Sequence, residues 1–188
     1  MHESGHILGT LYFEDDKNSW NAEITEDDKY ICGYPFGEDT LIKKELIKLD
    51  KTKWSLLLKK GDPVVNLHIP ANGKFTPEIV DESLKDIKEF LKECFPDYNY
   101  KAFVCCSWFL DPQNELLLKE DSNILKFAKR FNRFTHKDWG KSIFSFVYQM
   151  DNPVIEELPE NTSLQIAMKK HLLSGKTIYN VGGYFFDE

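Results

Sequence analysis

Several features that mark other classes of protein are missing from this sequence of 188 residues. No apolar run approaches the roughly 20 residues that span a bilayer, and the N-terminus lacks a basic segment followed by a hydrophobic one. An excess of positive charge is also missing, because the formal net charge is −7. A general nucleic-acid-binding surface needs a basic face. The sequence therefore predicts a cytoplasmic protein with no membrane segment and no nucleic-acid partner.

Cysteine is scarce, and its spacing fits neither a zinc site nor the disulfide framework of a secreted protein. The four cysteines are Cys32, Cys94, Cys105 and Cys106. In a cytoplasmic chain they are expected to be reduced and mostly buried. No metal site is predicted.

The composition is that of an ordinary globular protein, with 41% hydrophobic and 29% charged residues. The length is near that of one domain and is enough to bury a core. Linkers, repeats and low-complexity segments are absent. The sequence therefore predicts a single domain over residues 1–188.

The most regular segment is a strand, a turn and a helix in succession. Apolar and β-branched residues predict a strand over Val64–Ile69, followed by turn residues Pro70–Gly73. Thr76 and Pro77 are typical of a helix N-cap and first helical position. The predicted buried face of this helix consists of Ile79, Val80, Leu84, Ile87, Leu91 and Cys94. A helix N-terminus after a short glycine loop can bind an anion such as a phosphate.

The remaining pattern predicts an antiparallel start followed by alternating strands and helices. Before the central segment we expect a strand over Ile7–Glu14, a polar excursion over Asp15–Asp28, a strand over Tyr30–Tyr34 and a helix over Lys51–Lys60. After it we expect strands over Ala102–Phe109, Ser142–Tyr148 and Thr177–Phe186, with helices over Ser122–Phe134 and Ser163–Leu173. This βαβαβαβ order predicts an α+β (mixed α/β) fold, with helices against a central mixed sheet.

Two short motifs refine this pattern. Thr162 and Gln165 have the spacing of a capping box at the start of a helix. Gly182 and Gly183 interrupt the last strand, which indicates a bulge or the close approach of another backbone. If that strand is an edge, it can pair with a second copy, so a homodimer is compatible with the sequence.

Three segments carry a resemblance to a known family: HIPANGKFTPEIVDESLKDIKEFL (68–91), CCSWFLDPQNELLLKEDSNILKFAKRF (105–131) and LPENTSLQIAMKKHLLSGK (158–176). Together with GDPVVNLHIP before them, they resemble the GNAT-like C-terminal domain of a family of bacterial acyltransferases. The resemblance covers roughly Ile7 to the end. It implies a GNAT-like fold in which acyl-CoA, such as acetyl-CoA, is the cosubstrate and a small molecule is the acceptor.

The resemblance also implies where the cofactor binds. Acyl-CoA would lie between two splayed strands, Val64–Ile69 and Ala102–Phe109, with its pyrophosphate in the loop Ala71–Phe75. The implied cofactor-binding residues are Ile69, Pro70, Gly73, Lys74, Phe75 and Thr76. The usual loop signature of the superfamily, Gln or Arg followed by x-x-Gly-x-Gly or Ala, is absent, and only Gly73 and Lys74 offer close approach and positive charge.

This chain also differs from the usual GNAT pattern in the part that precedes the central sheet. Typical GNAT proteins have two helices there, and nothing between Met1 and Val64 matches them. Fuller members of the family have a helical region before this domain. The resemblance therefore implies an N-terminal helical partner domain, in a longer protein or as a separate chain.

The candidate catalytic residues are His68, Cys105 and Asp111. At the point where the sheet would open, His68 can accept a proton from an amine or hold an acyl carbonyl, although a histidine before proline at a strand end is more often a structural partner. Cys105 and Cys106 point to opposite faces, so one of them can be a nucleophile, and buried packing is the alternative. Asp111 lies past the strand end, where ligand sites form, and can equally turn the chain.

Further candidates have structural alternatives too. Ser122 and Asn123 start a helix and can contact CoA or act as caps. No tyrosine occurs between Tyr100 and Tyr148, so the tyrosine that GNAT enzymes use to protonate the thiolate has no match there. The remaining candidates for the acid that protonates the thiolate are Tyr148, Tyr179 and Tyr184. A basic stripe on the same helix comprises Lys126, Lys129, Arg130 and Arg133.

Two functional hypotheses follow. The first is an acyl-CoA-dependent N-acyltransferase that transfers an acyl group directly from CoA to an amine. The alternative is a GNAT-like binding or structural module without chemistry, which works with an N-terminal domain or partner.

Overall fold

The computed structural model of the chain describes residues 7–8, 10–12, 20–36, 42–70, 73 and 75–187. The strands are β1 (Ile7–Leu8), β2 (Thr10–Tyr12), β3 (Trp20–Ala22), β4 (Thr25–Glu26), β5 (Tyr30–Pro35), β6 (Ile47–Asp50), β7 (Val64–Asn66), β8 (Ala102–Ser107), β9 (Asn132–Trp139) and β10 (Tyr179–Phe185). The α-helices are α1 (Pro77–Cys94), α2 (Asn114–Leu117), α3 (Asn123–Ala128) and α4 (Ser163–Leu173). The 3₁₀ turns η1 (Trp108–Leu110) and η3 (Ile155–Glu157) and the π-helix η2 (Phe144–Tyr148) complete the fold.

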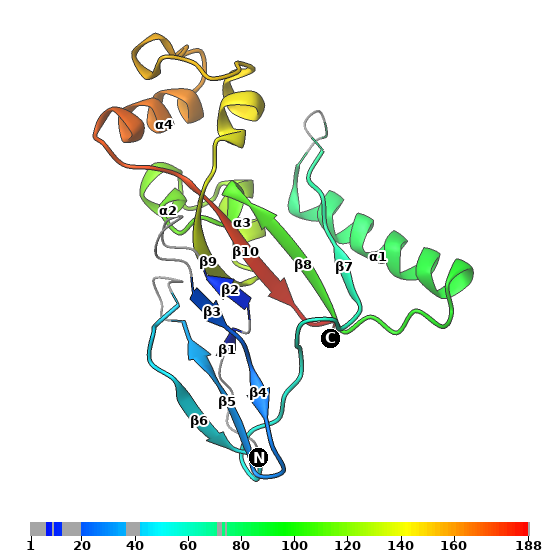
Figure 1. Cartoon of the computed structure of the whole chain (residues 1–188). Helices are drawn as coiled ribbons and strands as arrows, with labels where there is room; N and C mark the ends of the chain where they lie inside the picture. Colours follow the sequence, from blue (N-terminus) through cyan, green and yellow to red (C-terminus); the bar gives the residue numbers. More distant parts are fainter. Residues whose placement is uncertain are drawn as a thin grey trace.

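The N-terminal part is antiparallel, as predicted (Figure 1). β5 pairs with β1, β4 and β6, and β2 pairs with β3 in a hairpin. The strand predicted over Tyr30–Tyr34 is confirmed as β5, and the strand predicted over Ile7–Glu14 is divided into β1 and β2. The predicted polar excursion contains β3 and β4, while residues 13–19 lie outside the described part.

The prediction of a helix over Lys51–Lys60 is wrong. The backbone N–H and hydroxyl of Thr52 both donate to the Asp50 carboxylate, and the N–H of Trp54 donates to the Asp50 carbonyl. These bonds close a single turn after β6, and no regular helix follows it. An aspartate that satisfies nearby backbone donors competes with helix propagation.

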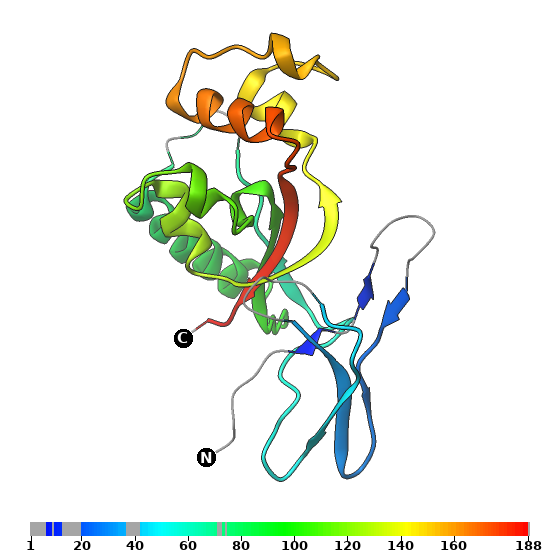
Figure 2. The ribbon, with the colours of Figure 1, turned by 90° about the vertical axis from the view of Figure 1, so that its left-hand side faces the viewer.

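The C-terminal part contains the mixed sheet that the sequence predicts, with strand order β7-β8-β10-β9. β7 runs parallel to β8, and β10 is antiparallel to both of its neighbours. Helices α1, α2 and α3 lie on one side of this sheet (Figure 2). The edges of this sheet are β7 and β9, and β10 lies between β8 and β9. The condition for a homodimer through the last strand, that this strand is an edge, is therefore not met.

Both long helices begin where the sequence predicts. The Thr76 hydroxyl caps α1 by accepting from the Ile79 N–H, and Pro77 is the first helical residue. Thr162 and Gln165 form the predicted capping box of α4. The predicted inner face of α1 is only half-buried, and Ile79 and Cys94 on that face are exposed.

The third predicted strand lies earlier in the chain than expected. β9 starts at Asn132, because this segment pairs with β10 opposite Tyr184. The predicted helix Ser122–Phe134 therefore ends at Ala128. The predicted strand Ser142–Tyr148 is instead the π-helix η2.

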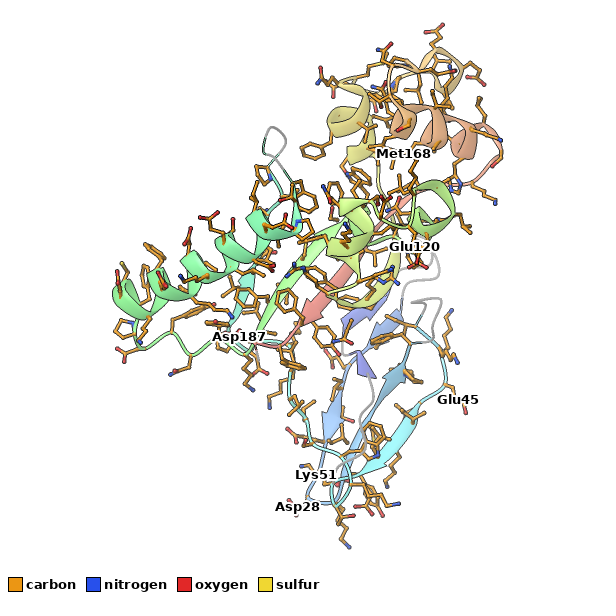
Figure 3. All side chains as sticks on the ribbon, turned by 180° about the vertical axis from the view of Figure 1, so that it is seen from behind. Asp28, Glu45, Lys51, Glu120, Met168 and Asp187 are labelled. Atoms are coloured by element: carbon orange, nitrogen blue, oxygen red, sulfur yellow. The ribbon has the colours of Figure 1, made fainter. Side chains whose placement is uncertain are left out.

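The connection from β9 to β10 forms a cap, residues 140–178, at the top of Figure 1. The cap has its own hydrophobic core, which includes Phe144, Tyr148 and Met168 and packs against Trp108. Figure 3 shows Met168 within this cap. The Tyr148 hydroxyl donates to the Gln165 carbonyl at 2.8 Å, which fixes η2 to α4.

The predicted basic stripe does not lie on one helix. Arg130 follows α3 and donates to Asp81 of α1 at 2.6 Å, whereas Arg133 lies in β9 and donates to Glu115 at 3.0 Å. Both arginines therefore join elements of the fold.

The paired glycines of β10 allow side chains, rather than another backbone, to approach closely. A Cβ atom on Gly182 would lie 2.6 Å from Cζ of Phe134, and one on Gly183 would lie 2.9 Å from Cδ1 of Leu110. A register shift of β10 against β9 occurs between Asn180 and Val181, slightly before the glycines.

Candidate functional site

The parallel strands β7 and β8 separate towards their C-terminal ends. Their register ends with Asn66 opposite Val104, and one further hydrogen bond joins the Leu67 N–H to the Val104 carbonyl at 2.8 Å. Beyond this point β8 continues to Ser107 beside β10, whereas β7 has ended. These are the two strands that the resemblance expects to diverge.

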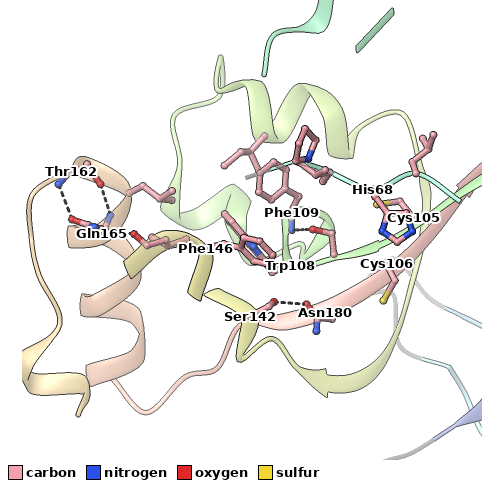
Figure 4. A pocket seen from close by; sticks show the side chains of 17 residues that line it. His68, Cys105, Cys106, Trp108, Phe109, Ser142, Phe146, Thr162, Gln165 and Asn180 are labelled. Carbon is pink, nitrogen blue, oxygen red and sulfur yellow. Dashed lines mark hydrogen bonds between the residues drawn. The ribbon is translucent and has the colours of Figure 1, made fainter. Parts of the chain in front are cut away.

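A cavity of about 490 Å³ opens between the separated ends of β7 and β8 and extends beneath the cap. Figure 4 shows His68 and Cys106 at one end of it and Thr162 and Gln165 at the other. Beneath the cap, the apolar part of its wall includes Trp108, Phe109, Ile124, Phe146, Val147 and Leu164. A concave, mainly apolar site with a few polar groups is typical of small-molecule binding.

Trp108 and Phe109 are held by the turn that follows β8. The Ser107 hydroxyl accepts the Phe109 N–H, and the side-chain amide of Asn114 donates to the Trp108 carbonyl at 2.7 Å. The rings of Trp108 and Phe109 meet edge to face, with centroids 4.4 Å apart. These contacts give the centre of the cavity a fixed aromatic wall.

His68 follows β7, lines the cavity and is exposed. Its Nε2 atom lies 3.3 Å from Nδ2 of Asn66. When Asn66 donates this hydrogen bond, the ring proton lies on Nδ1, and that nitrogen can donate to a ligand. The contact therefore orients the ring of His68.

The two adjacent cysteines have different environments. Cys105 is buried, and burial raises the pKa of its thiol to about 12, with a further contribution from Cys106. Cys106 points to the other face of β8 and is exposed. Cys94 is exposed as well, so the expectation of mostly buried cysteines is wrong. Both Cys105 and Cys106 line the cavity, but the thiol of Cys105 is almost entirely protonated at neutral pH.

Asp111 is buried and does not belong to the cavity wall. Its carboxylate accepts the backbone N–H groups of Gln113 at 2.9 Å and Tyr179 at 2.7 Å. Burial raises the pKa of Asp111, although the hydrogen bonds from Tyr179 and Gln113 act in the opposite direction. The side chain of Gln113 also contacts Nε2 of His171 in α4, at 3.1 Å. Asp111 thus ties the end of η1 to the start of β10.

The residues expected to bind the cofactor are divided between the cavity and its surroundings. Ile69 and Pro70 line the cavity. Phe75 packs edge to face on Phe109 and Phe127, and Thr76 caps α1. Gly73 lies between these two groups in sequence, and Lys74 lies outside the described residues.

The start of α3 is also outside the cavity wall. Ser122 is the N-cap of α3 and accepts the Leu125 N–H at 3.2 Å, and Asn123 is the first helical residue. The next residue, Ile124, does line the cavity. Ser122 and Asn123 therefore support a wall residue.

None of the three candidate tyrosines is among the described residues that line the cavity. Burial raises the pKa of both Tyr148 and Tyr184 to about 12. The Tyr148 hydroxyl donates a hydrogen bond to the backbone carbonyl of Gln165, which is a structural contact.

The sequence did not indicate the contribution of the cap to the cavity. Phe146 and Val147 come from η2, and Leu164 and Gln165 come from α4; Asn180 of β10 lines the cavity just after the cap. Asn180 accepts a hydrogen bond from the Ser142 hydroxyl at 3.3 Å at the base of the cap. The capping box at Thr162 was the one signal for this end of the cavity, but it predicts only where a helix begins.

Within the described ranges, no group of three or more His, Cys, Asp or Glu side chains is placed to hold a metal ion. Over the same residues, the structure contains no helix with the length and apolar character that crossing a membrane requires.

Comparison with known proteins gives a consistent result. A model of the family described as GNAT-like C-terminal domain matches residues 6–185. A solved structure of an acyltransferase in complex with decanoyl-CoA is similar, with 27% identity and a TM-score of 0.63 over 88% of this chain and 46% of that one. An acyltransferase in complex with CoA and 10C-teicoplanin has 26% identity and a TM-score of 0.62, over 87% of this chain and 46% of that one. No curated protein matches the chain. The chain spans less than half the length of each of these two structures.

Proposed function

The chain belongs to the family of GNAT-like C-terminal domains, and on that premise we propose that it binds acyl-CoA for transfer of the acyl group to an amine. The observation that carries this proposal is the cavity between the separating strands β7 and β8. Structures of similar acyltransferases hold decanoyl-CoA and CoA, which supports the assignment of the cosubstrate. In this proposal residues 1–188 act as one domain of a cytoplasmic protein, and the cytoplasm is a compartment that keeps cysteines reduced.

The separating strands suit the pantetheine arm of CoA, which carries two amide groups. Backbone polar groups alternate in direction along a strand. The Val104 carbonyl accepts from the Leu67 N–H, so it points towards β7. The backbone polar groups of Cys106, two residues later in β8, point to that same side, where β7 has already ended. An extended ligand with amide groups can lie along this edge of β8.

The pyrophosphate is assigned to the N-terminus of α1, with the loop Pro70–Phe75 around it. α1 is an 18-residue helix whose first turn begins at Pro77, and its N–H groups favour negative charge. Gly73 and Lys74 provide close approach and a positive charge in this loop. Ser122 and Asn123 at the start of α3 are assigned to the same side of the cofactor.

In the proposed reaction, the amine nitrogen attacks the thioester carbonyl carbon, the C–S bond breaks, and the amine proton is finally passed to the CoA thiolate. His68 lines the cavity and is the assigned polar residue of the reaction. It donates to the thioester carbonyl through Nδ1 while Nε2 accepts from Asn66, and it accepts the amine proton once the hydrogen bond from Asn66 is released. No covalent intermediate is required. A nucleophilic role for Cys105 is disfavoured by its raised pKa, and a catalytic role for Asp111 is disfavoured by its position outside the cavity wall.

A partner domain is also part of the proposal. β7 is an edge strand, and α1, although 18 residues long and amphipathic, has no fully buried residue. The similar acyltransferases are more than twice as long as the part this chain matches. We assign the acceptor-binding elements to an N-terminal helical domain that covers this edge. The alternative, a module that binds acyl-CoA without chemistry, is favoured by the absence of a tyrosine from the described cavity wall.

The first test is calorimetric titration of the purified chain with CoA and decanoyl-CoA. Gly73→Glu is expected to weaken binding of both ligands at least tenfold, because it places a negative charge beside the pyrophosphate. Among the described residues, the one heavy atom within 4 Å of a Cβ atom at Gly73 is Cγ of Pro70, at 3.2 Å, so the fold is expected to tolerate the change. Ser83→Glu, which adds the same charge at an exposed position in the middle of α1, is the control. Equal affinity of the two variants for CoA would exclude the loop as the pyrophosphate site. If the wild-type chain binds neither CoA nor decanoyl-CoA, the assignment of the cosubstrate is excluded.

The second test separates binding from turnover, which is measured as release of the CoA thiol with a panel of primary amines. His68→Ala is expected to slow turnover more than it weakens binding of CoA. Binding without turnover by the wild-type chain alone would support the partner domain or the non-catalytic module. Turnover by the chain alone would contradict both.

A further inference from the structure

Phe146 is unusual among the large hydrophobic residues that line the cavity, because 57% of its surface is exposed. Trp108, on the same wall, is 5% exposed and packs into the core of the cap. Phe146 lies on the outward side of η2, whereas Phe144 and Tyr148 in the same short helix are buried in that core. Its ring therefore contributes to the cavity but not to the core of the cap.

The backbone beneath Phe146 is fixed by contacts on both sides. The side-chain amide of Gln165 donates to the Val147 carbonyl at 2.9 Å, and the Tyr148 hydroxyl donates to the Gln165 carbonyl. The Met150 N–H closes η2 by donating to the Phe144 carbonyl at 3.0 Å. These bonds hold the ring at the cavity without using the ring itself.

The surroundings of Phe146 are apolar. Ile124, Val147 and Leu164 line the same cavity as Phe146, together with Trp108 and Phe109. The polar residues Thr162 and Gln165 of the far end are occupied in the capping box of α4. When an apolar ligand covers a large aromatic ring in such a concave apolar site, apolar surface is removed from water and the complex is stabilised.

We propose that Phe146 is a specificity-determining residue, whose ring packs against the methylene groups of the acyl chain and makes the site prefer medium-length acyl groups over acetyl. This inference rests on the proposed function, because it places the acyl chain of the bound thioester along the wall from Trp108 to Leu164. The thioester end lies towards His68 and the chain extends beneath the cap. Each methylene group covered by the ring increases the affinity, whereas the CoA part makes no contact with it.

The test compares the dissociation constants of CoA, acetyl-CoA, octanoyl-CoA and decanoyl-CoA for the wild-type chain and for Phe146→Ala. The wild-type chain is expected to bind decanoyl-CoA at least tenfold more tightly than acetyl-CoA. Phe146→Ala is expected to lose most of that preference while its affinity for CoA is unchanged, and Phe146→Leu to restore part of it. Phe90→Ala is the matched control, because Phe90 of α1 is 48% exposed and is not part of the cavity wall.

Two results with the CoA compounds would overturn the inference. One is a wild-type chain without preference for longer acyl groups, and the other is an equal preference in Phe146→Ala and wild type. Titration with free decanoate distinguishes this failure from that of the proposed function. If no CoA compound binds but decanoate binds to the wild type and not to Phe146→Ala, the apolar subsite is supported and the acyl-CoA assignment fails. If decanoate binding is unaffected by the substitution, the subsite itself is excluded.

Discussion

The Asp111 carboxylate accepts a 2.7 Å hydrogen bond from the backbone N–H of Tyr179, and this bond joins two elements that are distant in sequence. Asp111 follows η1, which supplies Trp108 and Phe109 to the cavity, and Tyr179 begins β10. The Gln113 side chain donates both to Asp111 and to the Thr177 carbonyl, and it contacts His171 of α4. This buried polar network therefore fixes the aromatic wall of the cavity relative to the cap.

Asp111→Asn is expected to destabilise the protein without changing its affinity for CoA. In the native structure the Gln113 side-chain amide donates to the Asp111 carboxylate. The NH₂ group of an asparagine would face this donor and could not accept its hydrogen bond. An unsatisfied buried polar group costs about 1–3 kcal/mol, and thermal unfolding measures this loss. Asp121→Asn, at an exposed position, is the control. A variant with native stability and lost turnover would instead place Asp111 in the chemistry.

His171 is expected to make stability depend on pH. Burial, together with the positive charge of Lys176, lowers the pKa of His171 below its ordinary 6.5, and Asp111 opposes this effect. The unfolded chain therefore takes up a proton at a higher pH than the native state does. Its contribution to stability is present above about pH 6.5 and is lost as the pH falls towards the lowered pKa, by at most about 1.4 kcal/mol per pH unit.

His171→Gln keeps a donor for Gln113 but removes the titration. Urea unfolding at pH 7.5 and pH 5.5 is expected to show a smaller loss of stability in this variant than in the wild type. The raised pKa of Asp111 acts with the opposite sign, because its contribution is present at acid pH and is lost as the pH rises through that pKa. An equal pH dependence in the two proteins would exclude His171 as its source.

The elements that the sequence predicted well are those with local signals. Thr76 and Pro77 fix the start of α1, and the pair Thr162 and Gln165 fixes that of α4, through contacts within four residues. The separation of β7 and β8 followed from the resemblance. In each case the determining residues lie close together in sequence or match a known motif.

The errors occurred where distant residues decide the structure. Ser142–Tyr148 is rich in the β-branched and aromatic residues that favour strands, but Phe144 and Tyr148 are buried four residues apart in the cap core, which is a helical spacing. The strand β9 begins at Asn132 because β10 pairs with it. The role of Phe146 in the cavity depends on this same arrangement of the cap, and no local pattern in the sequence indicates it.

The two adjacent cysteines are expected to react differently with iodoacetamide. At pH 7.5, Cys106 and Cys94 are exposed and are expected to be alkylated in the native protein, whereas Cys105 is buried and its pKa is about 12. Peptide fragmentation by mass spectrometry distinguishes the neighbouring residues. Cys105 is expected to react only in denaturant, and decanoyl-CoA is expected to slow the labelling of Cys106 but not of Cys94. Rapid native labelling of Cys105 would contradict its assigned burial.

Gly182→Ala tests the packing between β10 and the side chains on it. An added Cβ atom would lie 2.6 Å from Cζ of Phe134, whose ring also contacts Phe36 and Tyr184. Because these neighbours limit the movement of the half-buried ring, overpacking is expected to cost about 1–3 kcal/mol, measured by urea unfolding. Phe134→Leu removes the clashing ring atoms, so the double variant is expected to lose less stability than the sum of the two single variants. Additive losses would show that the two side chains do not compete for the same space.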